Sequence, residues 1–198
     1  MCSASPIPAG EPRPDSDGSV AGTVAVRLAV PGDSRAIAAV HVDSWQVAYR
    51  GLLPDDFLAG LSPEQRTGLW SGILTDPASG HVLVVERDDT ILGFAHAGPS
   101  GDDDAAPDTA ELYTIYVRPD AWGQGYGANL MAAVLEDLRG EGYGMVTLWM
   151  LSTNDRARRF YLHQGWLEGT GVRTQEFGGL VVTDHRLVRP LRPPASPR

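Results

Sequence analysis

Three glycines alternate with other residues in the run 122–127, and a helix is predicted directly after it. Glycines at alternate positions leave main-chain N–H groups uncovered, and the first N–H groups of a helix have no partner within it. These donors, together with the positive end of the helix dipole, suit a diphosphate. A tight turn that only needs glycine conformations is the alternative. The residues of this candidate site are Trp122, Gly123, Gln124, Gly125, Tyr126, Gly127 and Ala128.

Two widespread phosphate-binding loops are excluded. A P-loop needs a lysine after its last glycine, and all sixteen basic residues of this chain are arginine. A dinucleotide-binding fingerprint places its third glycine three residues after its second, whereas Gly127 follows Gly125 after two. That fingerprint also follows the first strand of its domain, and this loop comes after roughly the fourth.

A second group of residues recurs along the first predicted helix. His41, Trp45 and Tyr49 are spaced four apart, so they share one face of that helix. An aromatic face of this kind either packs into the core or lines a substrate pocket, and the sequence leaves both interpretations open. No second histidine or carboxylate stands at ligand spacing from His41, so we expect no metal site there.

The elements that must position these residues follow from hydrophobic periodicity and turn signals. Helices are expected over 31–49, from 54, from 62, over 125–140 and over 155–164. Strands are expected over 24–30, 81–87, 90–97, 110–117, 145–151, 166–177 and 180–188. This order predicts an α/β domain, in which a mixed sheet carries helices on its faces.

Composition limits the partners and the location. The formal net charge is −9, which argues against nucleic acid and favours a cationic or amine substrate, unless the acidity serves only to keep the protein soluble. The single cysteine, Cys2, excludes a disulfide framework and a cysteine-based zinc cluster. No apolar run has the length of a membrane span and residues 1–22 lack the pattern of a signal peptide, so we expect a cytoplasmic protein with no membrane partner. Residues 1–22 and 191–198 are expected to be disordered tails around a single domain, 23–190.

Two motifs resemble those of a known family. The run 112–131 resembles the cofactor-binding motif of the GNAT superfamily of N-acetyltransferases, Gln/Arg-x-x-Gly-x-Gly/Ala, with Gly125 and Gly127 in place but Trp122 at the Gln/Arg position. The run 154–166 resembles the family's Asn-x-x-Ala-x-x-Phe-Tyr-x-x-x-Gly-Phe helix, with Trp166 for the last phenylalanine. Both motifs in this order are more specific than either alone, and the resemblance extends over about 24–190.

The resemblance implies a GNAT-like fold with a mostly antiparallel sheet, acetyl-CoA as the cofactor, and acetyl transfer to a primary amine. The main-chain groups of Ile115, Tyr116 and Val117 would pair with the pantetheine arm as an added strand does. The glycine loop would hold the diphosphate. The first helices flank the acceptor site in this family, which would give His41, Trp45 and Tyr49 a role there.

The resemblance also implies catalytic roles. Glu111, eleven residues before Trp122, is the candidate base, acting directly or through water if burial raises its pKa. Strand alternation would place Glu111 on the same face as residues 113, 115 and 117. Tyr161 is the candidate acid for the leaving thiolate. Asn154 would cap its helix, which alone would explain it, and could also bond the pantetheine arm. Arg156 could pair with a CoA phosphate, the alternative being a solvated basic face.

Three alternatives remain open at this stage. The acceptor is a small molecule, or the N-terminus or side chain of a protein or peptide, or the chain is an acyl-CoA-binding module that has lost catalysis. A small acceptor predicts an enclosed pocket, whereas a peptide predicts an open groove between the first helices and the last hairpin. Many members of the family are dimers, so a homodimer is also left open.

Overall fold

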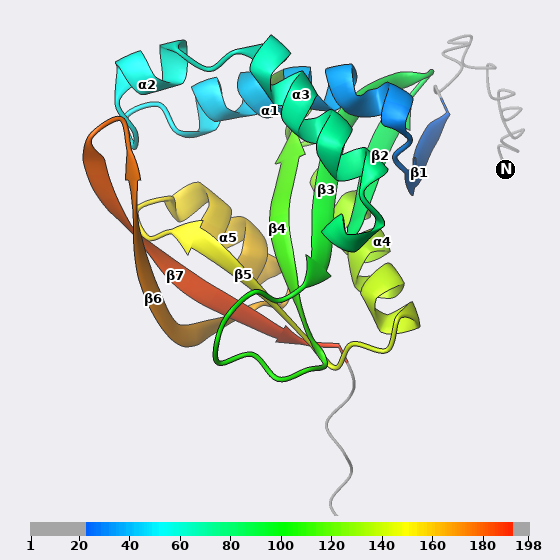
Figure 1. Ribbon diagram of the computed structural model, residues 1–198, viewed down its shortest axis with the longest axis vertical. Helices are drawn as coiled ribbons and strands as arrows, with labels where there is room; N and C mark the ends of the chain where they lie inside the picture. The colour runs from blue at the N-terminus through cyan, green and yellow to red at the C-terminus, as the bar shows by residue number, and fades with distance from the viewer. Residues whose placement is uncertain (1–22, 192–198) are drawn as a thin grey trace, which may run out of the picture.

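The computed structural model describes residues 23–191 (Figure 1). The tails expected at 1–22 and 191–198 lie outside these residues, apart from Leu191. Within this range one seven-stranded sheet has the order β1-β2-β3-β4-β5-β7-β6. Its strands are β1 (Val24–Leu28), β2 (His81–Arg87), β3 (Thr90–Pro99), β4 (Thr109–Val117), β5 (Met145–Leu151), β6 (Leu167–Phe177) and β7 (Leu180–Pro190).

The sheet is antiparallel at every pairing except β4 with β5, which run parallel. The helices are α1 (Ser34–Ala48), α2 (Asp55–Ala59), α3 (Pro63–Thr75), α4 (Tyr126–Gly140) and α5 (Asp155–His163). Short 3₁₀ turns lie at Pro31–Asp33, Pro77–Ser79 and Pro119–Ala121. The predicted fold class, a mixed and mostly antiparallel sheet flanked by helices, is confirmed.

Both faces of the sheet are covered. On β2, Val82 and Val84 face α1 and α3, where they pack in a cluster with Trp70. The alternate residues Leu83 and Val85 face α4 and join the larger core cluster. Because β2 is buried on both sides, its sequence is a continuous apolar run and does not alternate with polar residues.

The predicted elements are all present, with small shifts at their ends. The first strand ends at Leu28 and not at residue 30, because Pro31 begins a 3₁₀ turn before α1. Asp33 occupies the N-cap position of α1, but its carboxylate turns back to Arg27 at 2.7 Å and does not cap the helix. Ser62 does cap α3, where its hydroxyl accepts from the N–H of Gln65 at 3.3 Å.

One irregularity in β4 changes which side chains share a face. His96 pairs with Thr114 while Ala97 pairs with Leu112, so Tyr113 is an extra residue, a β-bulge. The expectation that Glu111 lies on the same face as residues 115 and 117 is therefore wrong. Residues 115 and 117 pack on the α4 side together with Leu112, whereas Tyr113 contacts His96 on the α3 side, with ring centroids 4.7 Å apart.

Among the helices of residues 23–191, none combines the length and the apolar character needed to cross a membrane.

Candidate active site

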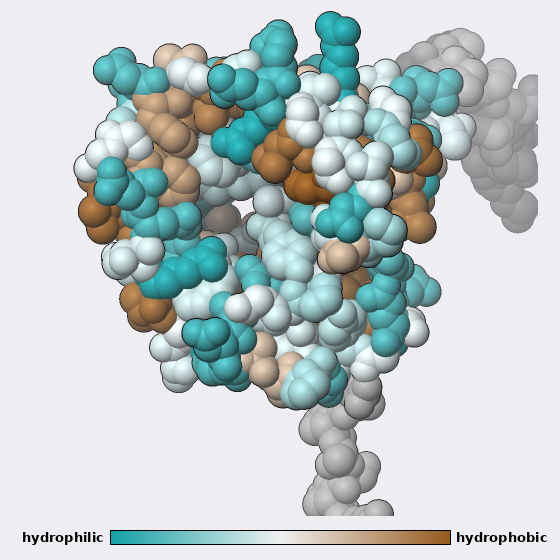
Figure 2. Space-filling model, viewed as in Figure 1, coloured by the Kyte–Doolittle hydropathy of each residue, from teal (hydrophilic) through white to brown (hydrophobic). Residues whose placement is uncertain are grey.

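The neighbouring strands β4 and β5 separate soon after they begin. They pair at only three positions, from Thr109 with Met145 to Glu111 with Thr147. Beyond this point β4 keeps its pairing with β3 and β5 keeps its pairing with β7, so the sheet opens between them (Figure 1). A pocket of about 870 Å³ lies in this opening. The surface is hollowed near the centre of the same face (Figure 2).

The open edge of β4 presents main-chain groups to this pocket. The N–H of Arg118 donates to the carbonyl of Leu92 at 2.8 Å, which fixes the alternation along the ladder between β3 and β4. The main-chain groups of Tyr116 therefore face β3. Those of Ile115 and Val117 face the opposite way, towards the gap left by β5. Of the three residues predicted to pair with a pantetheine arm, Ile115 and Val117 are placed to do so through their main chain, and Tyr116 lines the pocket with its side chain.

The carbonyl of Val117 is already engaged. It accepts hydrogen bonds from the hydroxyl of Ser44 at 3.0 Å and from the indole N–H of Trp122 at 2.7 Å. These bonds tie α1 and the glycine loop to the end of β4. The N–H of Val117 and both main-chain groups of Ile115 are the part of the edge left for a ligand.

The glycine loop begins α4 with uncovered donors. Gly123 and Gly125 have φ of +78° and +86°, a region that residues with a side chain rarely adopt. The first N–H to donate back along the helix is that of Asn129, to the carbonyl of Gly125 at 3.0 Å. The preceding N–H groups have no carbonyl four residues earlier within the helix, so they are free to meet an anion. They belong to Tyr126, Gly127 and Ala128.

The other two loop residues differ in their surroundings. A Cβ on Gly127 would lie 3.4 Å from the ring of Phe160, which is an ordinary van der Waals contact, so packing alone does not require a glycine there. The side chain of Gln124 turns back to the carbonyl of Asp120 at 3.3 Å and does not line the pocket.

Trp122 and Arg156 form a stacked pair beside the loop. The guanidinium carbon of Arg156 lies 3.3 Å from the centroid of the Trp122 ring. Arg156 forms no ion pair within residues 23–191, and desolvation lowers its pKa, although an arginine stays charged at neutral pH. Trp122 thus supports a cation beside the glycine loop, a role that Gln or Arg at its position could not fill in this way.

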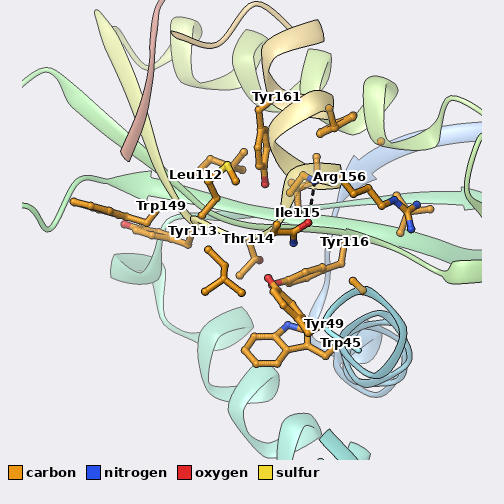
Figure 3. A pocket seen from close by; sticks show the side chains of 18 of the residues that line it. Trp45, Tyr49, Leu112, Tyr113, Thr114, Ile115, Tyr116, Trp149, Arg156 and Tyr161 are labelled. Atoms are coloured by element: carbon orange, nitrogen blue, oxygen red, sulfur yellow. Dashed lines mark hydrogen bonds between the residues drawn. The ribbon is translucent and has the colours of Figure 1, made fainter. Parts of the chain in front are cut away.

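Tyr161 points from α5 into the pocket, towards Leu112 and Thr114 (Figure 3). Its ring packs against Phe160 and Trp166, with centroids 5.4 and 5.9 Å away. Burial raises the pKa of Tyr161 well above that of an ordinary phenol. Its hydroxyl has no hydrogen-bond partner among the described residues, so a protonated phenol faces the pocket with its donor free.

Asn154 caps α5 as predicted. Its side-chain oxygen accepts from the N–H of Ala157 at 3.0 Å, and the residue is 8% exposed. Since the carbonyl oxygen is used by the cap, the amide NH₂ remains available to the pocket that Asn154 lines.

Trp45 of α1 and Tyr49, the residue directly after α1, form part of the opposite wall. The hydroxyls of Tyr49 and Tyr116 lie 3.2 Å apart and share a hydrogen bond. The ring centroids of Trp45 and Tyr49 are 4.9 Å apart, and both residues line the pocket (Figure 3). The predicted pocket role of these two residues agrees with their position.

His41 does not reach the pocket, contrary to expectation. It is 5% exposed, its Nδ1 accepts from the indole N–H of Trp70 at 3.1 Å, and its ring stacks on Tyr116. Burial, with a smaller contribution from Arg66, lowers the pKa of His41 to about 4, so it is a neutral core residue. The spacing of four identified a shared helix face, but Trp70 of α3 covers that face at His41.

Glu111 also lies outside the pocket lining, contrary to the simplest form of the prediction. Its position in β4 is still paired with β5, before the two strands separate. Burial raises its pKa, and the nearby Asp102 adds to that rise, while Arg173 opposes it. The carboxyl therefore has the raised pKa expected of a base, but the bulge and the pairing place it beside the pocket and not in its wall.

Several lining residues were not found from the sequence. They come from α3, from β5 and from the last two strands, where no motif singles them out. Asp184 is the most unusual of them, since a carboxylate that is only 2% exposed must be paired. These residues are Arg66, Trp149, Arg173, Gln175, Phe177 and Asp184.

Solved structures share this fold. PaiA N-acetyltransferase from Thermoplasma acidophilum, solved in complex with coenzyme A, superposes with a TM-score of 0.66 at 17% identity, over 85% of this chain and 99% of that chain. A putative acetyltransferase, yncA from Salmonella typhimurium with acetyl-CoA, has a TM-score of 0.66 at 20% identity, over 89% and 98% of the two chains.

Similarity in sequence identifies the family as well as the fold. A profile of the Acetyltransferase (GNAT) family matches residues 42–166. The uncharacterized N-acetyltransferase YuaI of Bacillus subtilis is 31% identical over 161 residues, which cover 78% of this chain and 91% of that protein. Because the profile spans most of the chain and includes both the glycine loop and α5, this protein belongs to the GNAT family of acetyltransferases and is an acyl-CoA-dependent N-acyltransferase.

Proposed function

We propose that this enzyme transfers an acetyl group from acetyl-CoA to the primary amine of a small molecule. The three free N–H groups at the start of α4, those of Tyr126, Gly127 and Ala128, form a cradle for an anion. The observation that carries the proposal is the continuity of one pocket from this cradle, along the free edge of β4, to Tyr49 and Tyr161. Acetyl-CoA supplies the acetyl group as a thioester.

The residues present fit this cofactor. The free N–H groups of Tyr126, Gly127 and Ala128 suit a diphosphate, and Arg156 offers an unpaired cation beside them. The edge groups of Ile115 and Val117 suit the amides of an extended arm. The side-chain NH₂ of Asn154 is a further donor to the same stretch.

Tyr161 is suited to an acid and not to a base. Its raised pKa keeps the proton on the hydroxyl at neutral pH, and no protein group within residues 23–191 competes for that proton. When the new N–C bond forms and the C–S bond breaks, the hydroxyl of Tyr161 can protonate the departing thiolate.

The proton lost by the amine needs a separate acceptor. Glu111 lies outside the lining, so we assign it this role only through water. Its raised pKa makes it a better match for an amine proton than an ordinary exposed glutamate. We assign the orientation of the amine to the hydroxyls of Tyr49 and Tyr116, which lie 3.2 Å apart.

The acceptor end of the pocket favours a small molecule over a peptide. The rings of Phe57 in α2 and Phe177 in β6 lie 5.4 Å apart, and a Cβ on Gly178 would lie 2.9 Å from the Cβ of Phe57. The last hairpin therefore touches the first helices where a peptide would need an open groove.

Cofactor binding is tested by Gly125→Val. A valine at a φ of +86° is strained and would tilt the donors of the cradle, so we expect CoA to bind at least about tenfold more weakly in calorimetry, a loss of about 1.4 kcal/mol. Gly142→Val is the matched control, since Gly142 has a φ of +92° at the other end of α4. Equal affinities in the two variants would refute the cradle, and the absence of thiol release with every amine tried would refute acetyl transfer.

A further inference from the structure

The charged residues that line the pocket are three arginines and one aspartate, in a chain whose net charge is −9. Arg156 lies at the cofactor end, stacked on Trp122. The other charges lie at the acceptor end, which is the part of the pocket lined by Trp45, Tyr49, Arg66, Arg173, Gln175, Phe177 and Asp184. The balance of charge at that end decides what kind of amine can enter.

Asp184 does not provide a free negative charge. Its Oδ2 accepts from Nε of Arg173 at 3.3 Å and from the side-chain amide of Gln175. Arg173 is further held over the ring of Trp149, with its guanidinium 4.6 Å from the ring centroid. The pair is neutral as a unit, and its members are occupied with each other.

Arg66 is the charge that remains. It projects from α3, and its guanidinium lies 5.8 Å from the centroid of the Trp45 ring. It forms no ion pair within residues 23–191. Asp56 lines the smaller hollow beside it but is not within ion-pair distance of it.

A free guanidinium beside aromatic walls repels an ammonium group and attracts a carboxylate or a similar oxyanion. Its fork of N–H donors matches two oxygens of such a group at once. The reacting amine would meet the hydroxyls of Tyr49 and Tyr116, which lie on the cofactor side of Trp45. The anion must therefore sit on a different part of the same molecule.

Resting on the proposed amine acetylation, we propose that the acceptor is an amino acid-like molecule whose anionic group, a carboxylate or related oxyanion, is held by Arg66. Polyamines and other acceptors with a second cation are disfavoured by the same residue.

The test uses sets of three acceptors that share one skeleton: an amino acid, its carboxamide and its decarboxylated amine. Thiol release is measured at saturating acetyl-CoA for the wild type, Arg66→Gln, Arg66→Lys and the control Arg87→Gln, which removes an exposed arginine at the end of β2. We expect the wild type and the control to prefer the carboxylate member by about tenfold to a hundredfold in kcat/KM. Arg66→Gln should lose this preference through KM, with the KM for acetyl-CoA unchanged, and Arg66→Lys should restore part of it.

Two results would overturn the assignment of Arg66 while acetyl transfer stands. One is a wild type that turns over neutral or cationic amines with no preference for the anionic member. The other is an Arg66→Gln variant that keeps the full preference. Absence of thiol release with every member of every set would instead overturn the proposed function, and this inference with it.

Discussion

The phenol of Tyr161 faces the pocket with its donor free, and burial keeps its pKa high. Tyr161→Phe removes this donor but keeps the ring that packs against Phe160 and Trp166. Because a general acid contributes about a hundredfold or more to the rate, we expect kcat for thiol release to fall by that order. Calorimetry should show little change in the affinity for CoA.

Tyr143→Phe is a suitable control for this variant, because Tyr143 lies outside the pocket lining and also loses only a hydroxyl. If both variants turned over at the same rate, Tyr161 would not be the acid.

If Glu111 is the base, the rate of the reaction should depend on pH. Its pKa is raised above the ordinary value of 4.5, so the base is lost as pH falls through that raised value, and the rate should show an acidic limb there. In Glu111→Gln this limb should disappear from the pH profile of kcat. Asp102→Asn should move the limb to lower pH, since the Asp102 charge helps to raise the pKa. An acidic limb that persists in Glu111→Gln would remove Glu111 from the mechanism.

The residues that sequence reasoning placed correctly are those with local functions. Gly125 and Asn154 act on the first turn of the helix that follows them, so a short motif contains their whole environment. His41 and Glu111 were misplaced because their surroundings come from distant segments. Trp70 covers His41, and an extra residue in β4 turns Glu111 away from the face of Ile115.

At the scale of elements, the N-cap of α5 is expected to serve both the fold and the cofactor. Asn154→Ala removes the bond to the N–H of Ala157, and Ser62→Ala removes the equivalent bond at the start of α3. Each loss should lower the free energy of unfolding by about 1 kcal/mol in urea titrations. Only Asn154→Ala should also weaken CoA binding, because Asn154 lines the pocket between β4 and β5 and Ser62 does not. Equal CoA affinity in the two variants would limit Asn154 to its capping role.

Elements with strong local signals were predicted nearly to the residue. The hairpin turn at Asp88 and Asp89 is one example, with both residues at positive φ, as a two-residue turn requires. The divergence of β4 and β5 could not be predicted, because it depends on which strands pair. β7 inserts between β5 and β6, and nothing in the local sequence of β5 states that its partner will be a strand some forty residues later.

At the scale of the whole molecule, His81 joins the sheet to the far end of α4. Its Nδ1 lies 2.7 Å from Asp137 and 3.0 Å from Glu141, and the bond to Asp137 is the main reason that the pKa of His81 is raised above 6.5. A raised folded pKa means that the stabilisation is complete below about pH 6.5 and is lost as pH rises through the higher value.

Unfolding of the wild type and His81→Gln at several pH values would check this. Their difference in stability should be constant at mildly acidic pH and should shrink at alkaline pH, and it should stay below about 1 kcal/mol because the histidine is half exposed. A difference that grew with pH would contradict the ion pair.

The net charge of the chain does not show how charge is distributed over the molecule. A net charge of −9 led us to expect attraction of cationic substrates, yet the charged residues that line the pocket are three arginines and one aspartate. Attraction at long range and selection within the pocket are therefore set by different residues.

The brief pairing of β4 and β5 places an unprotected strand edge in the middle of a sheet. Proteins normally guard such edges at their periphery, because unpaired main-chain groups recruit other chains. Here the surrounding helices shield the free edge of β4, and a bound ligand would cover it. Binding of the acyl donor should therefore stabilise the folded enzyme, because the ligand pairs with this edge only in the folded state. Resistance to heat, to proteases and to self-association should all rise with the concentration of the acyl donor.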